Sequence, residues 1–215
     1  MVQSKKEIIY KKLKGLIINN EIEPGSQIKE KYFAQKFGVS IMPVREALVQ
    51  LETEGFVEKF QGQLAIASNI TIKDVKDIFE IRDIIERGIA RHAAAIEDKK
   101  ALIEKRKEYI VKTSDGKILN DKEADLIFDD LHLFIADLVD NKQLKYMYIN
   151  VIERIKRIRN LFKDRTDKER LKELIDDHLH LLDAIIEGDF KNVEELVDEH
   201  LEKSMLYFVT RLVNY

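Results

Sequence analysis

Three of the five histidines in this chain, His132, His178 and His200, have side chains and spacing suited to binding a metal ion. Each lies in a segment that also carries an apolar stripe, such as Leu131 and Ile135 beside His132. A single histidine on an apolar face is more often a core residue than a metal ligand. The metal hypothesis therefore depends on the three side chains meeting at one place.

The spacing of the histidines along the chain favours such a meeting. His178 lies ten residues before Gly188, and His200 lies twelve residues after it. At ~1.5 Å per residue, they stand roughly 15 and 18 Å from that turn if both segments are helical, so an antiparallel hairpin brings them level. We expect His92 and His180 to lie outside the cluster, since His180 is about 200° around the helix from His178.

The elements that must hold these histidines are helices. From residue 71 onward, apolar residues recur at helical spacing between short polar or glycine-containing stretches. The expected helical stretches are about 71–96, 99–112, 121–139, 142–163, 167–187 and 189–213. Only two prolines and eight glycines in 215 residues also favour long helices. This part of the chain is therefore predicted to be an antiparallel helix bundle.

A different arrangement precedes the bundle. The segment from Glu30 to Phe56, EKYFAQKFGVSIMPVREALVQLETEGF, predicts a helix-turn-helix. Gly38 can take the positive φ that ends a helix, and Ser40 can accept a backbone N–H as the next N-cap. Pro43 falls in the first turn of the second helix, where its missing N–H breaks no helical hydrogen bond. The pattern alone fits an ordinary helical hairpin as well as a DNA-binding one.

Further elements are expected on both sides of this motif. The stretch from Ser4 to Asn20 has the apolar stripe of an amphipathic first helix. The stretches Phe56 to Phe60 and Gln63 to Ala67 alternate like strands around Gln61-Gly62, which predicts a β-hairpin.

Composition excludes several classes of protein. With 45% hydrophobic and 36% charged residues, the chain is typical of a well-folded soluble protein. No apolar run approaches the ~20 residues that span a bilayer, and the polar N-terminus is unlike a signal peptide, so we expect a cytoplasmic protein without membrane association. Because the chain has no cysteine, any metal must be held by nitrogen and oxygen.

Charge gives only weak support for DNA binding. The net charge of the chain is −3. Residues 1–70 carry 10 Lys+Arg and 8 Asp+Glu, a net of +2, which leaves 27 and 32, a net of −5, for the remainder. A difference of this size often arises by chance.

The flanking sequence resembles a known family. The run EPGSQIKEKYFAQKFGVSIMPVREALVQLETEGFVEKFQGQ is similar to the winged helix-turn-helix of the GntR family of bacterial transcription regulators. The likeness extends from Tyr10 to about Ala67 and fills almost every position of the signature PG…LA…GVS..PVREAL..L..EG. It implies that the β-hairpin is the wing.

The resemblance implies particular DNA contacts. Arg45 matches an arginine that reads a base edge, where a guanidinium can bind guanine through O6 and N7. Lys31 matches a basic contact to phosphate or base, and Ser40 with the following helix N-terminus would meet phosphate. Gly62 at the wing tip would approach the minor groove. Ile41 departs from the family, which usually has an arginine there, and a surface salt bridge to a neighbouring glutamate is the alternative role for Arg45.

Residues 75–210 resemble the FCD effector domain found in one large GntR subfamily. The segments that carry the likeness are FEIRDIIERGIARHAA, DDLHLFIADLVDNKQL, DHLHLLDAIIEGDF and VDEHLEKS. In metal-binding members, three histidines and an aspartate coordinate a divalent ion, and His132, His178 and His200 match the histidines. Three imidazoles and a carboxylate suit Zn²⁺, Ni²⁺ or Mn²⁺.

The aspartate of that metal site has no clean match. Relatives carry it four residues before the first histidine, and Phe128 stands there in this chain. Asp129 is the nearest substitute on the same helix face, while Asp125 and Asp130 remain alternatives.

Arg82, in FEIRDIIE, matches an arginine that points into the effector pocket of the family. Its guanidinium can bind a carboxylate through two parallel hydrogen bonds, which implies a small organic acid as effector. The alternative is an i,i+4 salt bridge to Glu86 on the helix surface.

Together these observations predict a mainly α protein, with a winged helix-turn-helix DNA-binding domain at 1–70 and an all-helical FCD-like effector and dimerisation domain at 71–215. We expect a ligand-responsive repressor that binds a pseudo-palindromic double-stranded DNA operator as a homodimer. In one alternative the metal or histidine cluster is purely structural. A metal-dependent hydrolase is the remote alternative, and because no separate general acid or base motif is present, we expect no enzyme activity.

Overall fold

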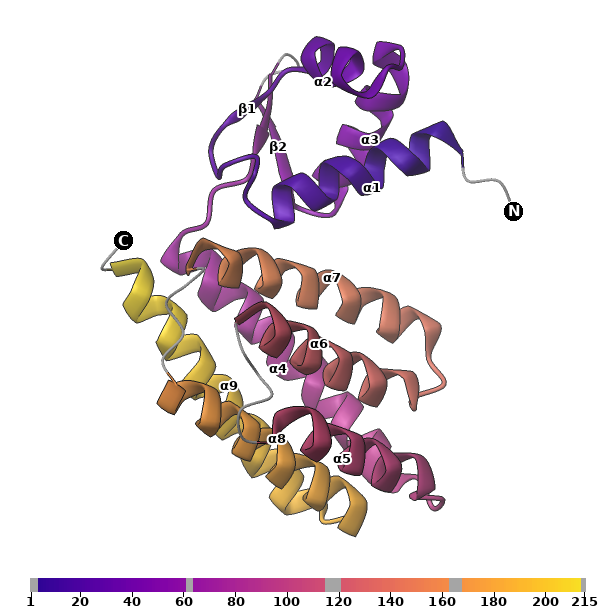
Figure 1. Ribbon diagram of the computed structural model, residues 1–215, viewed down its shortest axis with the longest axis vertical. Coiled ribbons are helices and arrows are strands. Elements are labelled where there is room, and N and C mark those ends of the chain that lie inside the picture. The colour runs from indigo at the N-terminus through magenta and orange to yellow at the C-terminus, as the bar shows by residue number, and fades with distance from the viewer. Residues whose placement is uncertain (1–3, 61–63, 115–120, 163–167, 214–215) are drawn as a thin grey trace. The chain divides into compact units, whose positions relative to one another are not determined.

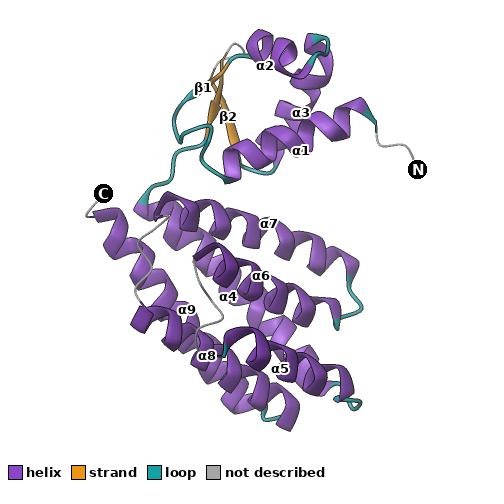
Figure 2. Cartoon of the chain, viewed as in Figure 1, coloured by secondary structure: helices purple, strands orange, loops and turns teal. Residues whose placement is uncertain are grey.

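The computed structural model describes residues 4–60, 64–114, 121–162 and 168–213. Two compact units are present: Met1–Thr71 with Lys156–Leu161, and Ile72–Ile155 with Phe162–Tyr215. The fold is mainly helical, with a small antiparallel sheet in the first unit and helices throughout the described part of the second, which confirms the predicted fold class (Figures 1 and 2).

The first unit is a winged helix-turn-helix. Its elements are α1 Lys5–Ile18, β1 Gln27–Ile28, α2 Glu30–Phe37, α3 Ile41–Thr53, β2 Val57–Phe60 and β3 Leu64–Ala67. The strand order is β1-β3-β2, and β3 pairs antiparallel with both neighbours. Strand β1 was not predicted. The expected turn at Gln61-Gly62 lies outside the described residues.

Local sequence signals explain the helix boundaries around the turn. Gly38 has a φ of 65°, in the left-handed region, and it ends α2. Ser40 has the extended conformation of an N-cap, with φ −70° and ψ 167°, but its side chain makes no capping hydrogen bond. The capping role expected for the Ser40 side chain is therefore absent, although the backbone still starts α3 at Ile41. In α1, by contrast, Ser4 Oγ accepts a hydrogen bond of 3.1 Å from the Glu7 N–H.

A single apolar core holds this unit together. Leu13 of α1, Leu48 of α3 and Phe56 before β2 are completely buried in it. Burying a side chain of this size contributes about 1.5–3 kcal/mol. The core fixes α3 and leaves its opposite face exposed, with Met42 and Val49 half exposed.

The second unit is built from antiparallel helices. Its elements are α4 Ile72–Ala95, α5 Lys100–Thr113, α6 Asp121–Asp137, α7 Lys142–Arg159, α8 Lys168–Glu187 and α9 Phe190–Val213. The end of α7 from Lys156 onward, and the 3₁₀ turn η1 Asn160–Phe162 as far as Leu161, are grouped with the first unit. Figure 1 shows α8 and α9 running side by side from their tight connection. No helix among the described residues is long and apolar enough to cross a membrane.

The α8–α9 hairpin is fixed at its turn. Gly188 has a φ of 73°, which lets the chain reverse between the two helices. Lys99 Nζ donates hydrogen bonds of 2.8 Å to the Ala94 carbonyl and 2.9 Å to the Ile185 carbonyl, at the ends of α4 and α8. Burial lowers the pKa of Lys99. The Lys99 ammonium group therefore links the ends of α4 and α8 close to Gly188. The position of this turn determines that His178 and His200 lie opposite each other on α8 and α9.

Candidate ligand site and DNA-binding surface

The structure brings the three predicted histidines together. His132 comes from α6, His178 from α8 and His200 from α9, and one ring nitrogen of each lies within 4.8 Å of the others. All three side chains are buried. The Nε2 atoms of His132 and His178 are 3.2 Å apart, and the ring centroids of His178 and His200 are 4.8 Å apart.

The other ring nitrogen of each histidine faces an oxygen atom. Nδ1 of His178 lies 2.8 Å from the hydroxyl of Tyr109. Nδ1 of His132 lies 3.4 Å from Glu86 Oε1. A carboxylate facing Nδ1, as Glu86 does at His132, accepts the proton there and leaves the Nε2 lone pair for a metal, as in many metal sites. The Tyr109 hydroxyl has the same effect on His178 when it accepts the Nδ1 proton.

The third such pair is looser. His200 Nδ1 lies 3.9 Å from Asp177 Oδ2, which is too long for a hydrogen bond. Both atoms are buried and, among the described residues, lack a hydrogen-bond partner. A small rotation of either side chain would join them, which would orient His200 in the same way as the other two histidines.

Arg82 points at the centre of this cluster. Its Nε donates a 2.8 Å hydrogen bond to Glu86 Oε1. Its Nη2 lies 3.3 Å from His132 Nε2 and 3.4 Å from His200 Nε2. The ion pair with Glu86 is therefore present, but it is buried rather than on the helix surface, with 5% and 7% of the two side chains exposed.

The protonation states of these groups follow from their surroundings. Burial, followed by the charges of neighbouring groups that include Arg82, lowers the pKa of His178 and His200 well below the ordinary value. Burial, the largest single influence on Arg82, lowers its pKa, but the charge and hydrogen bond of Glu86 together with the nearby Tyr148 and Asp129 outweigh burial, and the pKa rises. The site thus combines neutral imidazoles with a guanidinium cation. Neutral imidazoles are the form that binds metal, so the donor set fits a divalent ion.

The predicted carboxylate does not lie in the histidine cluster. Asp129 is half buried, and among the described residues it is not one of the group whose ligand atoms converge. Its charge adds a smaller contribution to the raised pKa values of Arg82, due mainly to Glu86, and of Tyr148, due mainly to burial. Asp130 binds Lys105 at 2.5 Å. Phe128 is buried and packs its ring edge-on against His178, with 5.0 Å between ring centroids.

Sequence analysis did not identify several residues of the site. Tyr148 donates a hydrogen bond to Glu86, and Arg170 adds a charge that lowers the pKa of His178 and His200. The partners of Tyr109 and Tyr148 lie 69 and 62 residues away along the chain, so no local pattern indicates them. Glu86 was visible as the i,i+4 partner of Arg82, but its contact with His132 was not.

The predicted DNA contacts lie at the surface of the first unit. Lys31 on α2, Ser40 before α3 and Arg45 on α3 are all exposed, while Gly62 lies outside the residues that the structure describes. Arg45 donates from Nη2 to Glu30 Oε2 at 2.9 Å, and 56% of its side chain is exposed. The surface salt bridge considered for Arg45 is therefore present in the DNA-free protein. It does not exclude a DNA contact, because exposed ion pairs exchange partners readily.

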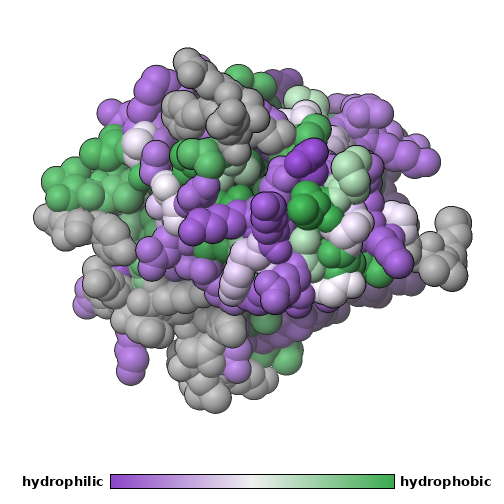
Figure 3. All heavy atoms as spheres, turned by 90° about the horizontal axis from the view of Figure 1, so that it is seen from above, coloured by the Kyte–Doolittle hydropathy of each residue, from purple (hydrophilic) through white to green (hydrophobic). Residues whose placement is uncertain are grey.

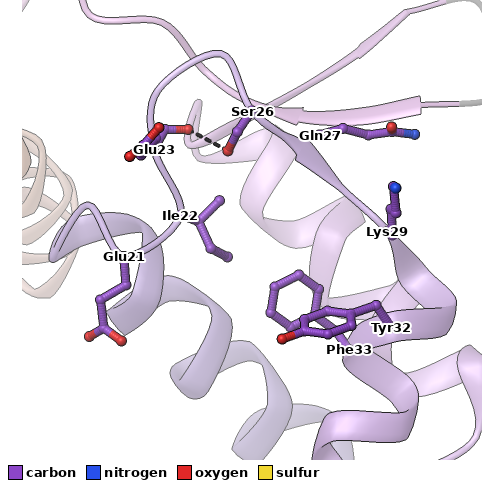
Figure 4. Close-up of a pocket in the computed structure, with 8 residues that line it drawn as sticks. All are labelled: Glu21, Ile22, Glu23, Ser26, Gln27, Lys29, Tyr32 and Phe33. Carbon is purple, nitrogen blue, oxygen red and sulfur yellow. Dashed lines mark hydrogen bonds between the residues drawn. The ribbon is translucent and has the colours of Figure 1, made fainter.

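A hollow of about 330 Å³ lies beside α2 in the same unit (Figure 4). Its wall includes the carboxylates of Glu21 and Glu23, and Ser26 Oγ donates a 2.6 Å hydrogen bond to the Glu23 carbonyl. The charged residues that line it are two glutamates and Lys29, a net negative charge that disfavours a DNA phosphate. On the face drawn in Figure 3, hydrophobic residues form patches among hydrophilic ones.

Comparison with known proteins identifies both units. Residues 5–64 match the family described as bacterial regulatory proteins, gntR family, and residues 77–203 match the FCD domain. The chain is 29% identical over 211 residues to the HTH-type transcriptional regulator LutR of Bacillus subtilis, covering 86% of this chain and 93% of LutR. It is 26% identical over 198 residues to the HTH-type transcriptional repressor RspR of Escherichia coli, covering 91% of this chain and 85% of RspR. These relatives are transcription regulators and not enzymes, in agreement with the prediction.

Solved structures show the same fold. E. coli McbR/YncC matches 98% of this chain and 99% of its own length, with a TM-score of 0.80 and 19% sequence identity. A GntR-type regulator from Rhodococcus sp. RHA1 matches 97% and 99%, with a TM-score of 0.71 and 18% identity.

Proposed function

Because the chain belongs to the GntR family and is a DNA-binding transcription regulator with an FCD domain, we propose that it senses a small organic acid through a metal ion. In this proposal it acts in the cytoplasm, as a repressor, and binds a pseudo-palindromic operator as a homodimer. The similarity to RspR, a transcriptional repressor, supports the direction of regulation. The observation that carries the proposal is that one ring nitrogen of each histidine lies within 4.8 Å of the others, with the Arg82 guanidinium 3.3 and 3.4 Å from Nε2 of His132 and His200.

The donor set supports an acid as the ligand. His132, His178 and His200 would hold Zn²⁺, Ni²⁺ or Mn²⁺ and leave coordination positions open. A bound divalent ion would attract a carboxylate oxygen to such a position. Arg82 would donate a charge-assisted hydrogen bond from Nη2 to the second oxygen, while its Nε stays on Glu86. Asp129 stays the proposed fourth protein ligand only if its side chain turns from Arg82 toward the ion.

Residues 1–70 would carry the DNA contacts, and residues 71–215 the effector site and the dimer contact. Arg45 would read a base edge, Lys31 and Ser40 would bind the backbone, and Gly62 would sit at the wing tip. Exposed apolar residues on the second unit support a dimer. Ile84 on α4 and Tyr146 on α7 are 68% and 64% exposed, as expected of surfaces that a second copy covers.

A purely structural metal remains the second candidate, because the three histidines are almost fully buried. The structural metal and the metal-assisted sensor differ in one measurable outcome. With a purely structural ion, the affinity of the protein for its operator stays unchanged when acids are added. A sensor requires that the acid bind the DNA-competent and DNA-incompetent states with different affinity.

The experiment combines metal analysis with DNA binding. Elemental mass spectrometry on untagged protein purified without chelator should find about one divalent ion per chain, and His178→Ala should lose it. Fluorescence anisotropy with an operator selected from random DNA should then show that a carboxylate changes the affinity of the metal-loaded wild type. Arg82→Ala should keep the DNA affinity of the acid-free protein and lose the response. A response that survives in Arg82→Ala would contradict the role given to Arg82.

A further inference from the structure

The histidine cluster lacks the negative charge that usually accompanies a buried divalent ion. Among the described residues, the group of converging ligand atoms contains the three histidines and no carboxylate. The nearby carboxylates of Glu86 and Asp177 face Nδ1 atoms, on the outer side of the rings. An ion held by the three neutral imidazoles alone would keep its full charge in a buried place, next to the cation of Arg82.

Arg82 and a metal ion would also compete for the same Nε2 lone pairs of His132 and His200. Its Nη2 lies 3.3 Å and 3.4 Å from the Nε2 atoms of His132 and His200. A neutral imidazole has one acceptor lone pair, which can accept a guanidinium hydrogen bond or bind a metal, but not both. Metal binding must therefore move Nη2 away from two histidines. Glu86 holds Nε of the same guanidinium, so the displaced group stays anchored beside the ion.

We propose that the metal ion and the acid bind this site as one unit, each weakly alone, because Arg82 blocks the histidine lone pairs until a carboxylate takes over its guanidinium. The proposal rests on the proposed function, whose site it specifies further. The carboxylate supplies the missing negative charge to the ion and a new hydrogen-bond partner to Arg82. By thermodynamic reciprocity, the acid then raises metal affinity by the same factor by which the metal raises acid affinity.

Phe128 offers a direct way to change this dependence. It lies four residues before His132, one turn along α6, and its ring packs against His178. An aspartate at this position would place a carboxylate on the same helix face as His132. Phe128→Asp should therefore supply the charge that the acid normally brings.

The test is calorimetric titration of Zn²⁺ into chelator-stripped, full-length protein, with and without acetate, using sodium nitrate at equal ionic strength as the control. In the wild type, acetate should tighten zinc binding about tenfold, within the usual range of coupling between two sites. Phe128→Asp should bind zinc about tenfold more tightly without acetate and gain little from it. Phe128→Leu, which keeps the position apolar, should behave like the wild type.

Arg82→Gln provides an independent readout that does not depend on a new charge in the core. Without the guanidinium, zinc alone should bind more tightly, while the effect of acetate should shrink. A purely structural role for Arg82 would instead weaken zinc binding. Circular dichroism checks that each variant is folded, and Arg82→Gln decides the question if Phe128→Asp is not.

The outcomes separate this proposal from the proposed function. Zinc binding of equal strength with and without acetate in the wild type would overturn the coupling and leave a metal site in place. Failure of zinc to bind the wild type under either condition would overturn the metal-assisted site itself, and the coupling with it. Acetate binding without zinc at undiminished affinity would also overturn the coupling.

Discussion

Two arginine–glutamate pairs, one in each unit, have the same chemistry in opposite surroundings. Arg45 and Glu30 meet at 2.9 Å with 56% and 29% of their side chains exposed. Arg82 and Glu86 meet at 2.8 Å with 5% and 7% exposed. The distances are almost equal, so the difference between the pairs lies in access to water.

Solvent access decides what each pair can do. Water screens the exposed pair, so Arg45 can leave Glu30 for a guanine edge at little cost. The buried pair has no water to replace a lost partner, so Glu86 fixes Arg82 firmly at the histidine cluster. An arginine that must bind and release DNA thus suits the surface, whereas one that must hold a fixed position at a ligand suits the interior.

Breaking the buried pair should give the largest effect. Glu86→Ala leaves a buried guanidinium without its carboxylate and should reduce the free energy of unfolding by about 3–5 kcal/mol. Urea unfolding followed by circular dichroism measures this. Glu30→Ala is the matched control and should leave the unfolding midpoint unchanged. Replacing both Arg82 and Glu86 by leucine should recover much of the loss, and failure to recover it would show that packing, not charge, dominates.

The two units should also differ in their response to pH. All five histidines lie in the second unit, and the first unit has none. Burial lowers the pKa of His178 and His200 in the folded unit. Below about pH 6.5, these two histidines are therefore protonated in the unfolded chain but stay neutral in the folded unit, which favours unfolding. Their contribution to stability is fully present above that pH and falls as the pH decreases, by up to ~1.4 kcal/mol per pH unit for each histidine.

Hydrogen–deuterium exchange of the metal-free protein at pH 7 and pH 5, corrected for intrinsic exchange rates, measures this difference. Segments of α8 and α9 should lose protection at pH 5, while segments of α1 and α3 should keep it. Equal loss in both units would show that carboxylates, rather than the buried histidines, control the response.

Sequence periodicity was enough to predict the helices of both units because each buries one continuous apolar stripe. Counting residues from Gly188 also anticipated that His178 and His200 would lie at one level, since helix rise is nearly constant. Strand β1 was not predicted because it has only two residues and exists through its pairing with β3, in which Gln27 meets Ile66, 39 positions along the chain.

The orientation of side chains could be predicted only in part. Spacing placed Asp129 on the same helix face as His132, but rotation about the helix decides which side chain reaches the cluster, and Phe128 packs there instead. The hydroxyl of Tyr109 meets His178 through tertiary packing, which leaves no trace in local sequence. The Ser40 side chain likewise matched the pattern of a cap without forming the bond.

Removing the exposed arginine tests the other half of the comparison. Arg45→Ala should weaken operator binding roughly ten- to hundredfold, because a bidentate arginine contact to guanine carries discrimination of that size. Binding to random DNA should change far less. Anisotropy titrations with both DNAs at one salt concentration measure the two effects, and an equal loss on both would mean that Arg45 contacts only phosphate.

The smallest effect should come from Glu30→Gln, which keeps the size of the side chain and removes its charge. Arg45 no longer has to leave a carboxylate, and one negative charge disappears beside the DNA, so operator and random DNA should both bind severalfold more tightly. Anisotropy titrations at two salt concentrations measure the gain, which should shrink at the higher one. If Glu30→Gln instead weakens operator binding alone, Glu30 orients Arg45 for base reading. The exposed pair would then position its arginine as the buried pair does, and solvent access would no longer distinguish their roles.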